Sequence, residues 1–277
     1  MNDPQVSEST QTKAPFLKTA LVLWILAICG AILLLPYLAS LESKALATAA
    51  SRMHMEMWEL LALSTIQTAV LTAFAVFAGL WAARKVGLGT PLIAAFLCRT
   101  LPPERTRSTL LFVLGVGVVT GLFLILLDGL VFARLPSVRA LITTAQSSAT
   151  RPKAWQGFLA SFYGAFDEEI LMRLGLLSLL ALAFRTLARR FGGDSGIELP
   201  VRVFWTANIL TALAFGLGHL PATAALAPMT AALVVRAIVL NGAAGLVFGV
   251  LYRRYGLEWA MASHFGTDLV LHVIVGA

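Results

Sequence analysis

Long apolar runs separated by short polar stretches dominate this chain. They lie at Phe16–Leu41 and at about 59–83, 108–133, 155–185, 202–222, 229–252 and 257–276. About 20 apolar residues are enough for an α-helix to cross the hydrocarbon core of a bilayer. The runs lack the period-two alternation of barrel strands, and lipid does not tolerate open sheet edges. The pattern predicts an all-α, polytopic transmembrane helical bundle of about seven spans.

Composition supports one membrane bundle rather than two soluble domains. Hydrophobic residues make up 58% of the 277 residues and charged residues only 13%, whereas roughly a quarter of a soluble domain is charged. We expect a polar, disordered tail at 1–14 and transmembrane helices without a recognisable motif at 15–150. The region 151–277 carries the chemistry described below. The two cysteines, Cys29 and Cys98, offer no paired framework.

The basic residues indicate a membrane surface rather than nucleic acid as their partner. The net charge is +7, but Lys and Arg stand in short clusters beside apolar runs. With the N-terminus inside, thirteen fall on the cytoplasmic side: Lys13, Lys18, Arg84, Lys85, Arg99, Arg105, Arg107, Arg185, Arg189, Arg190, Arg202, Arg253 and Arg254. Six fall on the other: Lys44, Arg52, Arg134, Arg139, Arg151 and Lys153. The positive-inside rule predicts an integral plasma (inner) membrane protein with a cytoplasmic N-terminus.

Two segments leave the topology open. The stretch 88–97 is apolar enough for an eighth, short or re-entrant element, and a full crossing there would reverse one end of the chain. The segment 153–185 is longer than one crossing requires. Either 154–166 lies along the interface, or one tilted helix carries the acidic residues near the midplane. We favour the tilted helix, because His264 and Asp268 lie well inside the last span.

Ionisable residues inside the apolar runs are the candidate chemistry. They are Glu168, Glu169, Arg173, His219, His264 and Asp268. A charge in the hydrocarbon region costs several kcal/mol, so such residues usually serve a function or pair with one another. The competing interpretation is a structural charge cluster that holds the helices in register.

The spacing of these residues separates their roles. Glu169 and Arg173 are four apart and share a helix face, so they can form an ion pair. Glu168 is rotated by about 100° and needs another partner, which suits a general base that takes a proton from water. His264 and Asp268 are also four apart and can aim at a common point.

Other polar residues receive less weight. A zinc site would use Glu168, His219 and His264, but no HExxH motif is present, so no metal is firmly predicted. We assign His272 to the membrane interface near the C-terminus. Asp128 lies near a membrane boundary, whereas Arg236 snorkels or offsets a carboxylate. Further along, Asn241, Gly245 and Gly249 form a small-residue stripe for helix packing.

Three motifs in order resemble the CPBP family of intramembrane proteases. They are EExxxR (Glu168, Glu169, Arg173), FxxxH (Phe215, His219) and HxxxD (His264, Asp268), each on its own apolar helix. The stretch GLVFGVLYRRYGLEWAMASHFGTD also resembles the family's approach to its last motif. The family, also called Abi, includes CAAX prenyl endopeptidases and bacteriocin-processing or immunity-associated members. The resemblance covers about 160–270 and makes 151–277 a CPBP-like catalytic core.

The resemblance implies a role for each matching position. Glu168 and His219 would orient and activate the attacking water, His264 and Asp268 would stabilise the oxyanion, and Glu169, Arg173 and Phe215 would support the site. The best-known members have asparagine where this chain has Asp268. An aspartate donates a hydrogen bond only when it is protonated, so Asp268 is either a protonated donor or the group that orients His264.

We therefore expect an intramembrane endopeptidase that needs no cofactor, with zinc as the alternative. Its partners would be a membrane-anchored or amphipathic peptide or protein substrate and membrane lipids, with no nucleic acid. A non-proteolytic scaffold or bacteriocin-immunity factor is the first rival. A small proton-coupled transporter is the second, and it is weakened because no two matching halves with Gly/Pro-interrupted spans are apparent.

Overall fold

Helices make up all the regular structure of the described residues, which are 14–100, 106–147, 151–192 and 198–275 of a computed structural model. No strand occurs in these ranges. The elements are α2 (Phe16–Leu41), α3 (Ser43–Met53), α4 (Met57–Val86), α5 (Pro91–Leu97), α6 (Thr106–Leu127), η1 (Asp128–Phe132), α7 (Pro136–Ser147), α8 (Ala154–Tyr163), η2 (Gly164–Glu168), η3 (Ile170–Leu177), α9 (Ser178–Arg190), α10 (Val201–Gly218), α11 (Leu220–Leu226), α12 (Ala231–Tyr255), α13 (Leu257–Asp268) and η4 (Leu269–Val275). The expected all-α bundle is confirmed. Apart from Ala14, the N-terminal tail lies outside the described residues.

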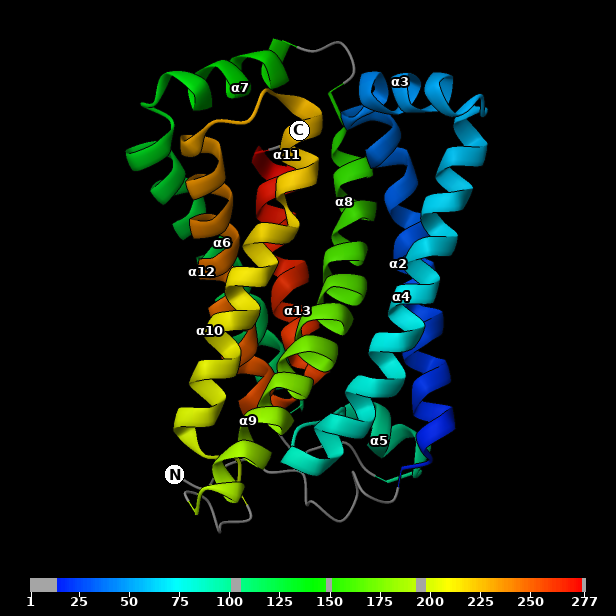
Figure 1. Ribbon diagram of the computed structural model, residues 1–277, viewed down its shortest axis with the longest axis vertical. Coiled ribbons are helices and arrows are strands. Elements are labelled where there is room, and N and C mark those ends of the chain that lie inside the picture. The colour runs from blue at the N-terminus through cyan, green and yellow to red at the C-terminus, as the bar shows by residue number, and fades with distance from the viewer. Residues whose placement is uncertain (1–13, 101–105, 148–150, 193–197, 276–277) are drawn as a thin grey trace.

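Six helical segments are long and apolar enough to cross a membrane. They are Phe16–Leu41, Met57–Val86, Thr106–Phe132, Ala154–Arg190, Val201–Leu226 and Ala231–Tyr255. Each coincides with one of the seven expected runs. The seventh run forms α13 and η4 but is not among the six, because four ionisable residues, Glu258, His264, Asp268 and His272, interrupt its apolar character. This segment nevertheless runs through the bundle between α8 and α12 (Figure 1).

The stretch 88–97 does not make an eighth crossing. Its helix, α5, has only seven residues, which is about 10 Å of helix. Two hydrogen bonds attach this region to the start of α13. Ile93 N donates to the side-chain Oε1 of Glu258 at 2.8 Å, and Leu257 N donates to Gly89 O at 3.0 Å. The segment is therefore a short element at one end of the bundle (Figure 1).

The long segment 154–190 is one helical crossing, as we favoured. The alternative of a separate interfacial stretch at 154–166 is wrong, because α8 packs against α2 and buries Gly157, Ala160 and Ser161. Two π-helical stretches, η2 and η3, interrupt the α-helix on either side of Glu169. The Ser178 hydroxyl donates to Arg173 O at 3.2 Å, where η3 gives way to α9. π-Helical turns are rare and often mark functional sites.

Small residues allow the helices to approach closely around this central crossing. A Cβ at Gly79 of α4 would collide with Leu174 O of η3, and a Cβ at Gly117 of α6 would collide with Ser263 O of α13. On α12, Gly245 lies against Ala212 of α10. The expected packing role of the stripe on α12 is confirmed.

The outer surface is as apolar as the interior. On α4, Ile66, Val70 and Phe74 recur at four-residue spacing with 61%, 64% and 71% exposure. In water such a stripe would be an unpaired hydrophobic patch, whereas in a bilayer it contacts lipid tails. Together with the six apolar segments, this arrangement makes the chain a multi-pass membrane protein.

Candidate active site

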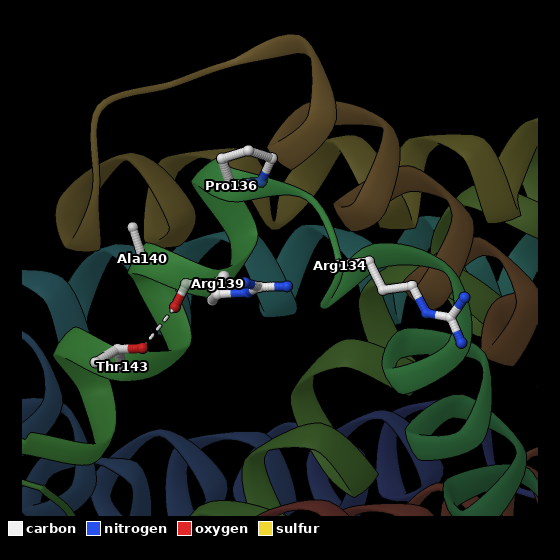
Figure 2. Close-up of a pocket in the computed structure, with 5 residues that line it drawn as sticks. All are labelled: Arg134, Pro136, Arg139, Ala140 and Thr143. Carbon is white, nitrogen blue, oxygen red and sulfur yellow. Dashed lines mark hydrogen bonds between the residues drawn. The ribbon is translucent and has the colours of Figure 1, made fainter.

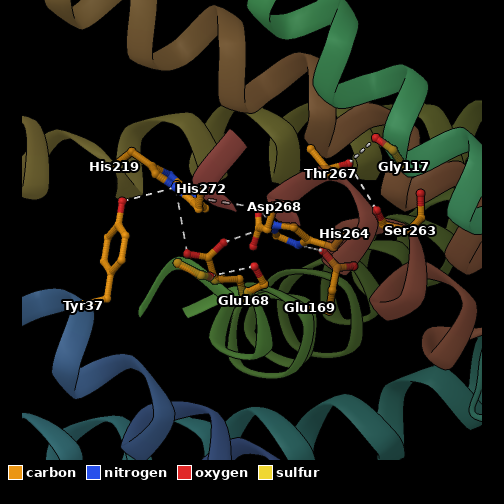
Figure 3. Close-up of polar contacts among 12 residues, drawn as sticks. Tyr37, Gly117, Glu168, Glu169, His219, Ser263, His264, Thr267, Asp268 and His272 are labelled. Carbon is orange, nitrogen blue, oxygen red and sulfur yellow. Dashed lines mark hydrogen bonds and ion pairs between the residues drawn. The ribbon is translucent and has the colours of Figure 1, made fainter. Parts of the chain in front are cut away.

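Three separate helical segments bring the sequence-predicted residues together in the middle of the bundle (Figure 3). Glu168 ends η2, His219 stands between α10 and α11, and His264 belongs to α13. Glu168 Oε1 lies 3.9 Å from His219 Nε2, and Glu168 Oε2 lies 3.6 Å from His264 Nε2. The glutamate that the spacing left without an intrahelical partner therefore faces both imidazoles.

Glu169 and Arg173 form the expected ion pair beneath this cluster. Arg173 Nη1 lies 3.1 Å from Glu169 Oε1, and both residues are fully buried. Arg173 Nη2 also donates to Gly245 O at 3.2 Å. The guanidinium lies 4.8 Å from the ring centroid of Phe215 and 5.3 Å from that of Phe248, both distances typical of cation–π contacts. These contacts fix Glu169 below His264.

His264 is held by one stacked aromatic ring and at one ring nitrogen. Its Nδ1 lies 2.8 Å from Glu169 Oε1. Its ring stacks on Phe248 with centroids 4.5 Å apart and an interplanar angle of 22°. A carboxylate can only accept, so Nδ1 carries the proton of this bond. Nε2 then points toward Glu168 and toward Asp268 Oδ1, each 3.6 Å away.

His219 is fixed by the end of its own helix. α10 ends at Gly218, one residue before His219, and Pro221 lies in the first turn of α11. His219 Nδ1 lies 2.8 Å from Phe215 O, and since a carbonyl only accepts, Nδ1 donates. In the neutral ring, the lone pair of Nε2 therefore faces Glu168. Phe215 supplies this carbonyl and packs its ring edge-on against His219, with centroids 4.8 Å apart.

Among the described residues, the cluster is partly exposed at Glu168, His219 and His272, whose side chains are 22%, 32% and 37% exposed. Those of Glu169 and His264 are 0% and 6% exposed.

Two contacts of the site were not predicted from the sequence. His272, which we assigned to the membrane interface, lies four residues after Asp268 on the same helix face, and its Nε2 lies 4.0 Å from Asp268 Oδ1. Its Nδ1 lies 3.2 Å from the hydroxyl of Tyr37, at the far end of α2. Tyr37 belongs to a run that we read only as a span, and no spacing links it to a residue 235 positions away.

Asp167 was also missed, although it stands in the run DEE. It is completely buried, and neither carboxylate oxygen has a hydrogen-bond partner among the described residues. The carboxylate lies against Gly30 of α2, where a Cβ would collide with Oδ2. The glycine thus leaves room for an acid on the face of η2 that packs against α2.

The charged pair outside the site is structural. Arg236 Nε and Nη2 both lie 2.7 Å from the carboxylate oxygens of Asp128, in a bidentate arrangement. The expectation that Arg236 offsets a carboxylate is confirmed. The pair joins η1 to α12 and lowers the cost of placing either charge in an apolar helix.

Two open hollows lie on the surface, away from this cluster. One, of about 460 Å³, is lined by Arg134, Pro136, Arg139, Ala140 and Thr143 around the start of α7 (Figure 2). The other, of about 600 Å³, lies between α3 and α11 and includes Lys44 and Arg52. Neither is lined by a residue of the three motifs.

A metal would have to use Glu168, His219 and His264. Among the residues that the structure describes, no group of three or more His, Cys, Asp or Glu side chains is arranged to hold a metal ion. A carboxylate beside two oriented imidazoles provides a base and directed polar groups at one point, which suits hydrolysis by water.

Comparison with known proteins gives a match over the part of the chain that carries the cluster. Residues 150–270 match the family model described as type II CAAX prenyl endopeptidase Rce1-like. Comparisons with curated proteins and with solved structures gave no match. The matched range includes all three motifs, and it extends about ten residues further toward the N-terminus than the resemblance we described from the sequence. Over residues 150–270, which are less than half of the chain, this protein is therefore similar to the type II CAAX prenyl endopeptidase Rce1-like family.

Proposed function

We propose that this protein is an intramembrane endopeptidase in which Glu168 and His219 activate a water molecule for attack on a peptide bond. The observation that carries the proposal is the position of Glu168, whose two carboxylate oxygens face one imidazole each at 3.9 and 3.6 Å. The family match over residues 150–270 supports a CAAX-type endopeptidase in general. The contacts of the individual side chains suggest how each would act.

The first step is deprotonation of water. Glu168 Oε1 and the lone pair of His219 Nε2 are both acceptors, and 3.9 Å is too long for a direct hydrogen bond. One water can donate to both, which orients its oxygen lone pair toward the substrate carbonyl. Glu168 takes the proton as the new C–O bond forms, and it later delivers this proton to the leaving amine as the C–N bond breaks.

The second requirement is a donor for the oxyanion that develops on the carbonyl oxygen. His264 is the candidate, because Glu169 holds its Nδ1 and leaves Nε2 directed into the site. A ring protonated on both nitrogens donates from Nε2, and the carboxylates of Glu169 and Asp268 favour that cation. Arg173 holds the Glu169 carboxylate in place.

Substrate and setting follow from the architecture. The partly exposed side of the cluster opens within an apolar bundle, so we propose a membrane-anchored or amphipathic peptide or protein as substrate, with membrane lipids as the other partner. We further propose that no cofactor is required. The excess of basic residues at one end of the bundle supports a cytoplasmic N-terminus in a plasma membrane.

A non-proteolytic scaffold or immunity factor is the rival that survives, since the same side chains could hold helices together. It predicts partner binding without turnover. The partial exposure of Glu168 and His219 favours the enzyme, because a purely structural charge cluster gains nothing from staying open.

The purified full chain in proteoliposomes is expected to cleave an amphipathic membrane peptide, with mass spectrometry identifying the two products. To find such a peptide, membrane peptides can be compared between cells that carry the wild-type chain and cells that carry Glu168→Gln.

We expect the cleavage rate to stay within about twofold after prolonged treatment with EDTA and phenanthroline, because side chains alone supply the base and the donor. Loss of cleavage on chelation, restored by zinc, would instead support the metal alternative. Stable partner binding without any wild-type product would favour the scaffold.

A further inference from the structure

Asp268 is the position at which this chain departs from the best-known members of its family, and its surroundings define what it can do. Its Oδ1 lies 3.6 Å from His264 Nε2 and 4.0 Å from His272 Nε2. Its other oxygen packs against Gly164 of η2, where a Cβ would collide with it. Two imidazole nitrogens therefore converge on one carboxylate oxygen.

Tyr37 contacts the ring nitrogen of His272 that is not directed at Asp268. The phenol hydroxyl lies 3.2 Å from His272 Nδ1, and the two rings meet edge to face with centroids 5.4 Å apart. When the hydroxyl donates to Nδ1, the proton of the neutral ring is on Nε2, which faces Asp268. The opposite tautomer would set a lone pair of His272 against an ionised carboxylate.

We infer that Tyr37 and His272 form a relay that holds Asp268 as a hydrogen-bond acceptor beside His264. Asp268 then acts through His264 by its charge: it favours the cationic ring, whose Nε2–H stays available to the oxyanion, so Tyr37, His272 and Asp268 are positioning residues. The 4.0 Å contact between His272 Nε2 and Asp268 Oδ1 is longer than a direct hydrogen bond and is expected to shorten when substrate binds. This inference rests on the proposed function.

The relay also accounts for the departure from asparagine. An asparagine carbonyl oxygen accepts from two N–H groups as a carboxylate oxygen does. Either residue can therefore serve as the acceptor, and neither needs to donate to the substrate. Both Tyr37 and His272 lie outside the family match at 150–270. Through Tyr37, the helix α2 contributes to the site.

The activity test compares Tyr37→Phe with the control Tyr255→Phe, because the Tyr255 ring lies beside Phe112, outside the cluster. We expect Tyr37→Phe to lower kcat by about ten- to a hundredfold, the usual range for partners that orient a functional ligand, with KM and thermal stability unchanged. His272→Leu should behave alike, whereas His272→Gln, which keeps an N–H donor, should recover part of the rate.

In an Asp268→Leu background, Tyr37→Phe should have no further effect. An unchanged kcat in Tyr37→Phe, or an equal loss in the Asp268→Leu background, would overturn the relay.

A second readout does not depend on turnover. In ¹⁵N spectra of the full chain in nanodiscs, His272 should be the Nε2–H tautomer, and Tyr37→Phe should produce a mixture of tautomers. A wild-type His272 with its proton on Nδ1 would overturn the relay even in an active enzyme. Absence of cleavage by the wild-type chain would overturn the proposed function instead, so the two failures are distinguishable.

Discussion

Replacing Glu168 with glutamine is expected to lower kcat by about 10²- to 10⁴-fold, the contribution of a positioned general base. Glutamine keeps the size and hydrogen-bonding reach of the side chain but cannot take the proton from water. The substitution should leave the fold intact, because the Glu168 side chain is 22% exposed and carries no buried ion pair of its own. Steady-state cleavage of a membrane peptide by the purified variant measures the loss.

The matched control is Glu198→Gln, which removes an exposed carboxylate outside the cluster. Its kcat should equal that of the wild-type chain. A Glu168→Gln variant that retained full activity would contradict the mechanism, whatever its stability. A variant that lost activity together with its thermal transition would point to a structural role for Glu168 instead.

Replacing Arg173 with methionine should destabilise the protein by about 3–5 kcal/mol, the usual cost of removing one partner from a buried ion pair. Arg173 and Glu169 are both fully buried, and the substitution leaves the Glu169 charge without its cation. It also removes the guanidinium between Phe215 and Phe248. Thermal or denaturant unfolding of the variant and of the wild-type chain in mild detergent measures the change in the free energy of unfolding.

Two controls separate charge from packing. Arg190→Met removes an exposed cation at the end of α9 and should change stability little. The double variant Glu169→Gln/Arg173→Met removes both charges, so it should be more stable than Arg173→Met alone. If the double variant were instead less stable than Arg173→Met, the lost stability would come from packing rather than from an uncompensated charge.

The architecture was largely predictable from sequence, because lipid imposes a simple rule on the backbone. Apolar runs of span length must be helical, and six of the seven expected runs coincide with apolar helices. The seventh, which ends in η4, is harder to recognise by hydropathy because His264 and Asp268 belong to the site. The ionisable residues of the candidate site thus lower the mean hydropathy of the helix that carries them.

The charged cluster was predictable where spacing on one helix decided the contact. The four-residue separations of Glu169 with Arg173 and of His264 with Asp268 both appear as close pairs. Glu168 faces the two imidazoles, as its rotation away from Arg173 suggested. These inferences needed only helix geometry and the cost of an unpaired charge.

Contacts between distant helices, and departures from α-helical geometry, were not predictable. Nothing in the local sequence marks Tyr37 as a partner of His272 or shows that Asp167 packs against Gly30. The π-helical turns of η2 and η3 change the rotation of side chains around Glu169, and the apolar pattern does not distinguish them from α-helix. Such features depend on tertiary packing, which a single-chain pattern does not encode.

The most direct test of the shared site is a double-mutant cycle between Glu168 and His219. If both side chains act on the same water, removing either one removes most of the activation, and kcat losses of such residues are far from additive. We expect Glu168→Gln/His219→Gln to be no slower than the slower single variant. A double variant whose loss equals the product of the two single losses would mean that Glu168 and His219 act independently, contrary to a water held between them.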